Sequence, residues 1–197
     1  DPTPMVGMVG VIKDVDKCCT QNFKNERDVI VLLGENSNDL SGSEYLYVIH
    51  KLKKGDPHID LAMEKKVQHT CLDAIESGIV ASAHDCSEGG LAIALAESCI
   101  SKSDKMLGAT IKLEGDLRKD SVLFGEKPSR ILVSVKTGNL NHLEELAKKH
   151  SIPYSVLGTV GGKDLSIDIA GSKAINLPLK ELSATWRNAI PRRLEKR

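Results

Sequence analysis

The sequence predicts an α/β domain in which a mixed β-sheet is covered by helices. Short apolar runs alternate with longer segments of helical periodicity, and the two kinds interleave without the strict order of a repeated βα unit. The chain has 197 residues, enough for one substantial core. We therefore expect a single domain over 1–197, with a strand leading in from an upstream domain over 1–12 and a flexible tail over 191–197.

The first predicted elements are two strands separated by a polar loop. Met5 to Ile12 combines Val, Met and Ile with two glycines, a pattern typical of a buried strand with close backbone approach. Residues 13–27 are polar and charged, as expected of a surface loop. The continuous apolar run that ends at Leu33 indicates a second strand, buried on both faces.

Two helices are expected next, each with a capping residue. Ser43 can cap a short helix, and Asp60 can cap a longer one that Gly78 is placed to end. The short helix is expected to pack through Leu46, Ile49 and Leu52. The apolar face of the longer helix consists of Met63, Val67, Cys71 and Ala74, which recur at helical spacing.

The remaining chain continues the alternation of strands and helices. A strand from Ile79 to Ala83 is followed by a helix from about Leu91 to Ile100, which has a single charged residue and should be buried. Further strands are expected at Ala109 to Leu113, Arg130 to Val135, Ser155 to Val160, Leu165 to Ile169 and near Ile175. A helix starts near Asn141, with Glu144 completing a capping box, and a closing helix runs from Leu179 to Ile190.

Composition argues against several classes of function. Lys plus Arg and Asp plus Glu both count 27, so no overall field favours nucleic acid or anionic lipid. Aromatic residues are 3%, too few for the stacking platforms of single-strand binders. No apolar run approaches the ~20 residues of a membrane span, and the five cysteines form no C-x-x-C pair. We expect a cytoplasmic protein that binds neither nucleic acid nor membrane.

The strongest local signal is the turn from Ser82 to Leu91, between a strand and a buried helix. Paired glycines there would let free backbone N–H groups and the helix dipole hold a phosphate, and a carboxylate of the turn could reach phosphate-bound Mg²⁺. Alternatively, Asp85 or Ser87 caps the helix while the glycines allow close packing against the strand. The residues alone leave both readings open. The candidate ligands are Asp85, Ser87, Glu88, Gly89 and Gly90.

A second candidate segment runs from Leu123 to Arg130 and leads into a strand. Glu126, Ser129 and Arg130 could line a cleft and bind a polar ligand, because loops at strand ends build the sites of open α/β sheets. The simpler alternative is a surface turn closed by an ion pair between Glu126 and Arg130. His84 is expected to be a hydrogen-bonded structural residue, since no nucleophile is placed beside it.

A third glycine-bearing segment, Gly158 to Lys163, looks like a phosphate loop. Asp164 stands where such a loop has Ser or Thr, and strands flank the segment on both sides. The sequence therefore predicts a hairpin turn.

Taken together, these segments resemble the formylglycinamidine ribonucleotide synthetase family, within the wider group of aminoimidazole-ribonucleotide-synthetase-like ATP enzymes. The resemblance follows the family's order through Pro2 to Gly10, Gly42 to Tyr45, Ser82 to Leu91 and Leu123 to Arg130. Two positions depart from the pattern: Ser41 stands where Gly is usual, and Lys127-Pro128 replaces a small polar pair.

The resemblance implies a C-terminal subdomain of the aminoimidazole ribonucleotide synthetase-like fold, in a polypeptide built of two similar halves. It implies an ATP- and Mg²⁺-dependent ligase of purine biosynthesis, which converts formylglycinamide ribonucleotide and glutamine-derived ammonia to the amidine. The implied partners are the N-terminal portion of the same polypeptide, a glutaminase subunit and a small bridging subunit. Because the chain opens on Asp1 instead of Met, we expect a fragment of a longer chain. The resemblance implies that this fragment is inactive alone, since the family's catalytic residues lie outside it.

The resemblance assigns neither a catalytic residue nor a metal ligand to this chain. Two other functions stay open. One is a domain of another ATP-using enzyme of the same superfamily. The other is a structural and interaction module whose nucleotide site has degenerated.

Overall fold

The computed structural model describes residues 5–36, 38–115 and 118–195, and within these ranges the strands form one mixed sheet. The order across the sheet is β2-β4-β1-β5-β3-β6-β7. The strands are β1 (Val29–Leu33), β2 (Val80–Asp85), β3 (Ala109–Leu113), β4 (Ile131–Val135), β5 (Tyr154–Val160), β6 (Asp164–Ile169) and β7 (Ser172–Pro178). Neighbouring strands are antiparallel except β3 and β6, which are parallel.

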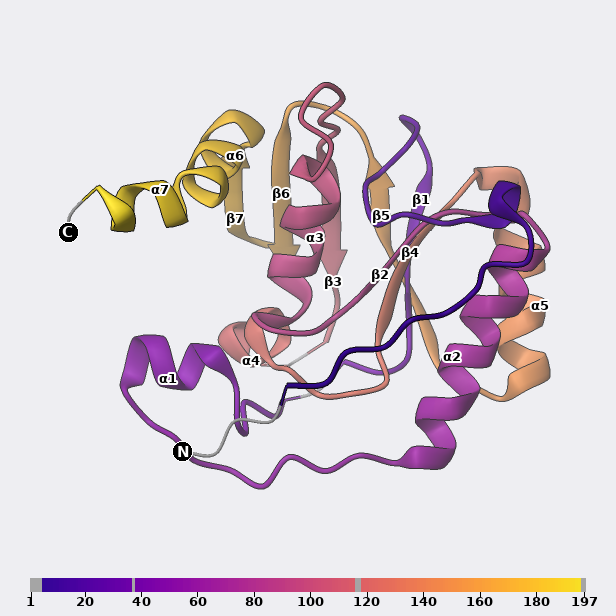
Figure 1. Cartoon of the computed structure of the whole chain (residues 1–197), viewed down its shortest axis with the longest axis horizontal. Coiled ribbons are helices and arrows are strands. Elements are labelled where there is room, and N and C mark those ends of the chain that lie inside the picture. Colours follow the sequence, from indigo (N-terminus) through magenta and orange to yellow (C-terminus); the bar gives the residue numbers. More distant parts are fainter. Residues whose placement is uncertain (1–4, 37, 116–117, 196–197) are drawn as a thin grey trace.

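Helices cover both faces of this sheet (Figure 1). They are α1 (Glu44–His50), α2 (Leu61–Glu76), α3 (Gly90–Ile100), α4 (Lys119–Phe124), α5 (Leu140–His150), α6 (Leu179–Arg187) and α7 (Ala189–Leu194). None of these helices is long and apolar enough to cross a membrane. The predicted class, a mixed sheet covered by helices, is confirmed.

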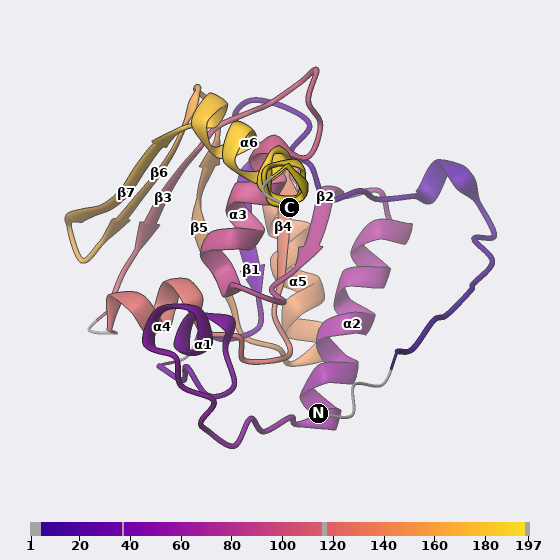
Figure 2. The ribbon, with the colours of Figure 1, turned by 60° about the vertical axis from the view of Figure 1, so that its left-hand side comes forward.

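The sheet separates two apolar clusters, and β1 contributes to both. Ile30 and Leu32 pack with α3, α4 and α6 on one face, whereas Val29, Val31 and Leu33 pack with α2 and α5 on the other. Because both faces of β1 are buried, every residue of the strand is apolar, and its sequence is a continuous apolar run. Figure 2 shows α2 and α5 together on one side of the sheet and α3 on the other.

The N-terminal strand predicted over Met5 to Ile12 is wrong for this structure. The segment is irregular, and its side chains are exposed, with Met8 at 91% and Ile12 at 67%. An apolar strand needs a sheet edge or a second layer to bury it, and no described residue supplies one here. Pro2 to Pro4, which begin the same prediction, lie outside the described residues.

The C-terminal prediction is also corrected. The closing helix divides at Asn188 into α6 and α7, so most of the predicted flexible tail, 191–194, is helical. Pro191 is tolerated because it lies in the first turn of α7, where no intrahelical N–H bond is lost. Residues 196 and 197 lie outside the described part of the chain.

Two predicted caps are confirmed and one is wrong. The Asp60 carboxylate accepts the N–H groups of Ala62 and Met63, and the Ser43 hydroxyl accepts that of Leu46. The capping box at Asn141 does not form. A 3-10 turn over Thr137–Asn139 leads directly into α5, which begins at Leu140 without a side-chain cap.

The predicted packing of α1 and the predicted hairpin between β5 and β6 are also wrong. None of the residues of α1 is buried, and Ile49 and Leu52 are 59% and 42% exposed. Moreover, β5 and β6 are not a hairpin, since β3 lies between them in the sheet. The turn between them instead receives Gly108, whose N–H donates to the carbonyl of Gly162.

Candidate functional site

The two predicted site segments meet because β2 and β4 are antiparallel neighbours. Asp85, the last residue of β2, lies opposite Ile131, the first residue of β4. The turn that follows β2 and the loop that precedes β4 are therefore held side by side. The N–H of Cys86 donates to the carbonyl of Arg130 at 3.0 Å, which ties them together.

The paired glycines begin α3 in a conformation that favours glycine. Gly89 and Gly90 have φ of 79° and 64°. A Cβ on Gly90 would lie 2.4 Å from the carbonyl oxygen of Gly125. Gly90 therefore allows α3 to approach the end of α4, whereas the packing alternative expected a close approach to the strand.

The polar side chains of the turn bond to one another and do not cap α3. The Ser87 hydroxyl donates to the Asp85 carboxylate, and this bond is the main cause that lowers the pKa of Asp85 below its ordinary value. The N-cap residue of α3 is Gly89, and it has no side-chain bond. The capping reading of Asp85 and Ser87 is therefore wrong, and Glu88 is exposed to solvent.

The Glu126 carboxylate binds backbone at the start of two helices. Its Oε1 accepts the N–H of Gly89 at 2.7 Å and the N–H of Glu44 at 2.9 Å. Gly89 precedes the first residue of α3, and Glu44 is the first residue of α1. The ion pair that we expected between Glu126 and Arg130 does not form.

Arg130 is instead an internal clamp of the loop before β4. Its side chain is 3% exposed, and this burial lowers the pKa of the guanidinium. Its Nε donates to the carbonyl of Lys127 at 3.0 Å, its Nη2 to that of Gly125, and its Nη1 to Asn36 Oδ1 at 3.3 Å. A guanidinium occupied in this way fixes the loop on both sides of Glu126.

Two further polar residues near the turn have structural contacts. The Ser129 hydroxyl donates to the Glu64 carboxylate on α2 at 2.6 Å, so it serves the packing of α2 against the loop. His84 Nε2 lies 2.8 Å from Glu97 Oε2 on α3, with its ring largely buried. His84 is thus a hydrogen-bonded residue that joins β2 to α3, as predicted.

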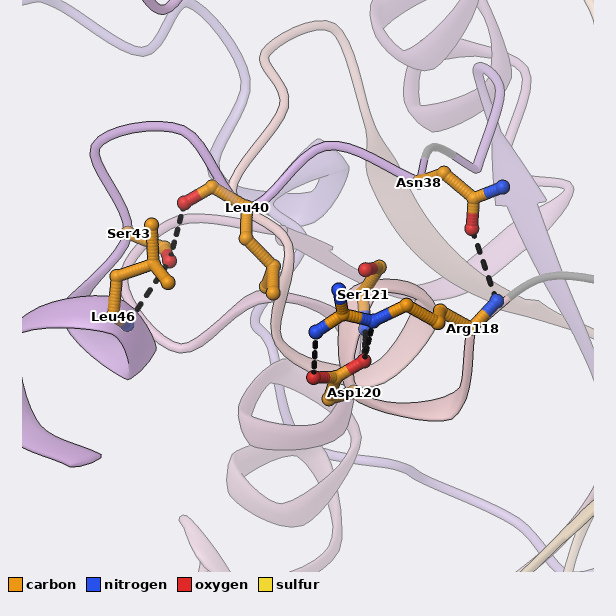
Figure 3. A network of polar contacts seen from close by, with 7 residues as sticks. All are labelled: Asn38, Leu40, Ser43, Leu46, Arg118, Asp120 and Ser121. Atoms are coloured by element: carbon orange, nitrogen blue, oxygen red, sulfur yellow. Dashed lines mark hydrogen bonds and ion pairs between the residues drawn. The ribbon is translucent and has the colours of Figure 1, made fainter. Parts of the chain in front are cut away.

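The segment before α1 is fastened to its surroundings by a small polar network (Figure 3). Ser43 donates to the carbonyl of Leu40 at 2.7 Å while it caps α1. Asn38 Oδ1 accepts the N–H of Arg118 at 3.1 Å, and Arg118 forms an ion pair with Asp120 on α4. The Asn38 bond therefore joins this segment to the residue that precedes α4, while the Ser43 bonds fix the turn that leads into α1.

The residues of the turn do not fit a nucleotide phosphate as they are arranged. The N–H of Gly89 is engaged by a carboxylate, and that of Gly90 by the carbonyl of Ser87. In the described part of the chain, no three His, Cys, Asp or Glu side chains gather as a metal site. Nucleotide binding by the eight residues that the sequence singled out stays a prediction.

Sequence reasoning missed the partners that decide this site. Asn36 carried no signal of its own, and Gly42 to Tyr45 was interpreted as a helix cap and as part of the family resemblance, without a contact for Glu44. Glu44 lies 82 residues from Glu126 along the chain, so no local pattern could have paired them.

Comparison with known proteins finds relatives that share one name. It is 45% identical over 196 residues to the phosphoribosylformylglycinamidine synthase subunit PurL of Caldanaerobacter subterraneus, covering 99% of this chain and 26% of that protein. It is 44% identical over 190 residues to the PurL of Alkaliphilus metalliredigens, covering 96% and 25%. The chain thus spans about a quarter of the length of these curated relatives.

Solved structures share the fold at lower identity. Thermotoga maritima PurL, complexed with FGAR, superposes with a TM-score of 0.73 at 22% identity, over 86% of this chain and 30% of that one. The family described as AIR synthase related protein, C-terminal domain, matches residues 26–169. Because this match covers most of the chain, the chain belongs to the AIR synthase related protein family, as its C-terminal domain.

Proposed function

We propose that this chain is part of a phosphoribosylformylglycinamidine synthase subunit of the PurL type. The observation that carries the proposal is the 45% identity to a PurL over 99% of the chain. The whole protein is then an ATP-dependent C–N ligase that converts formylglycinamide ribonucleotide and glutamine-derived ammonia to formylglycinamidine ribonucleotide. Since the chain is about a quarter of such a subunit, we assign the catalytic residues to the rest of it.

Cofactors and partners follow from the same proposal. Thermotoga maritima PurL has been solved with ATP and with ADP, and also as PurLQS. We propose that the whole enzyme uses ATP with Mg²⁺ in the cytoplasm. Its partners are the N-terminal portion of the same polypeptide, a glutaminase subunit and a small bridging subunit.

Within that enzyme we assign this domain a supporting role. The Glu126 carboxylate accepts the N–H of Gly89 in the turn after β2. This contact favours a structural and interaction role for the domain over a second nucleotide site. The exposed apolar side chains of Met5 to Ile12 also support it, because such a surface is typical of a contact with another domain.

The proposal is tested on the whole subunit that contains this chain. With ammonia as nitrogen donor, we expect ADP release that requires formylglycinamide ribonucleotide, and none when formylglycinamidine ribonucleotide or selenide replaces it. A subunit from which the residues of this chain have been deleted should no longer release ADP in this assay. ADP release that depends on either alternative substrate would assign the chain to another enzyme of the superfamily.

A further inference from the structure

We propose that Glu126 is an internal anion that closes the turn after β2, so that this turn fastens α1 to α3 and receives no nucleotide phosphate. The proposed function enters only through the expectation that an ATP enzyme of this family could bind nucleotide here. The contacts of Glu126 stand independently of it. Glu126 then has a role other than the nucleotide contact predicted from the sequence.

One oxygen of Glu126 carries the inference. Oε1 accepts the N–H groups of Gly89 and Glu44, which belong to elements 45 residues apart and come together at this carboxylate. Both groups lie at helix starts, where the positive end of the helix dipole favours an anion. A carboxylate that accepts two backbone N–H bonds satisfies the groups that would otherwise bind a phosphate.

The position of this carboxylate is fixed by its neighbours. Arg130 binds the carbonyls of Gly125 and Lys127, the residues on either side of Glu126. Gly90 and Gly125 lie so close that a Cβ on Gly90 would meet the Gly125 carbonyl at 2.4 Å. The loop is therefore already shaped around the turn, and Glu126 reaches Gly89 without rearrangement.

The contacts of Glu126 matter for α1 because this helix is short and lies at the surface. It has no buried residue, and its contacts with the rest of the domain include the Glu44 bond and the stacking of Tyr45 on Phe124, with ring centroids 5.0 Å apart. Both partners, Phe124 and Glu126, come from the end of α4 and the loop after it. Loss of the carboxylate should therefore loosen α1 more than it loosens the sheet.

The experiment compares this chain with Glu126→Gln, Glu126→Ala and the control Glu88→Gln. Glu88 is an exposed carboxylate of the same turn, so its variant changes the charge but not the two N–H bonds. Hydrogen exchange is read at the amides of Gly89 and Glu44, and Mg-ATP and inorganic phosphate are titrated calorimetrically into each protein.

We expect no binding of Mg-ATP or phosphate to the wild-type chain. Hydrogen exchange at both amides should accelerate by at least about tenfold in Glu126→Ala, because the two N–H groups lose the carboxylate oxygen that accepts them. Glu126→Gln keeps a neutral oxygen that can accept both N–H groups, so exchange should accelerate less. This variant still tests the role of the carboxylate if the alanine variant unfolds. Glu88→Gln should exchange like the wild type.

Two results would overturn the inference. One is Mg-ATP binding to the wild-type chain that is lost in Glu126→Gln, which would make Glu126 a nucleotide contact. The other is unchanged exchange at Gly89 and Glu44 in both Glu126 variants. Neither result depends on the ligase assay of the whole subunit, so failure of the inference and failure of the proposed function are distinguishable.

Discussion

Arg130 shows how one buried charge organises the loop before β4. Its guanidinium is 3% exposed and donates to two backbone carbonyls and to the Asn36 side chain. Burying a charge in this way costs free energy, and these hydrogen bonds offset that cost.

Replacing Arg130 by Ala should therefore destabilise the domain by about 3 kcal/mol, because it leaves the buried Gly125 carbonyl and the part-buried Lys127 carbonyl unpaired and creates a cavity. Arg130→Lys should destabilise the domain less, since the lysine ammonium can still donate to one of the carbonyls. Urea unfolding measures both. Arg118→Ala, which removes an exposed side chain, is the control, and an equal loss there would contradict this role of Arg130.

The cysteine thiols should differ in reactivity according to burial. Burial raises the pKa of Cys71 and Cys99 to about 12 and that of Cys86 to about 11, whereas Cys18 is exposed. A raised pKa leaves less thiolate, the reactive form, at any pH below it. At pH 8, an aromatic disulfide reagent should label Cys18 first, as mass spectrometry can show. Labelling of Cys99 at the same rate would contradict the buried assignment.

At the scale of elements, α3 is placed by a glycine contact that no larger residue can make. Gly78 and Gly90 have nearly the same positive φ, 68° and 64°. A Cβ on Gly78 would meet nothing within 4 Å, whereas on Gly90 it would meet the backbone of α4 and the loop after it. The pair therefore separates backbone strain from steric overlap.

Gly78→Ala should cost about 1–2 kcal/mol, the penalty for a left-handed conformation with a side chain. Gly90→Ala should cost a further 1–3 kcal/mol or so, because the start of α3 must move away from Gly125. Thermal and urea unfolding compare the two variants. Equal losses would mean that the close approach of α3 and α4 contributes nothing to stability.

At the scale of the whole molecule, the N-terminal segment is separate from the packed core. Residues 5–18 are exposed throughout, whereas Phe23, a few residues later, is 1% exposed. The apolar side chains of the segment have no cover among the described residues. The expectation that 1–12 joins another part of a longer polypeptide stays a prediction.

Deleting residues 1–17 should thus leave the free energy of unfolding within about 0.5 kcal/mol of its original value. It should also reduce self-association, since exposed apolar surface promotes aggregation. Urea unfolding and light scattering measure the two effects. Deletion through Phe23 should destabilise the domain strongly, and a large loss from the shorter deletion would show that the segment packs on the core.

The sequence by itself determined the elements whose signals are local. Apolar runs and helical spacing predicted the strands from β1 onward and the helices α1, α2, α3, α5 and α6 to within a few residues, whereas α4 was not predicted. The caps at Ser43 and Asp60 could be predicted because each cap bonds within its own first turn. The motifs of the turn after β2 and of the loop before β4 were likewise visible as segments, and their family resemblance agrees with the comparison.

Only the tertiary structure decided what those segments do to one another. The order of the strands, the insertion of β3 between β5 and β6, and the exposure of Met5 to Ile12 depend on contacts between distant parts of the chain. Glu126 could be read from the sequence as a ligand or as an ion-pair partner. It became a backbone acceptor because folding brings Gly89 and Glu44, 37 and 82 residues away, to the same carboxylate oxygen.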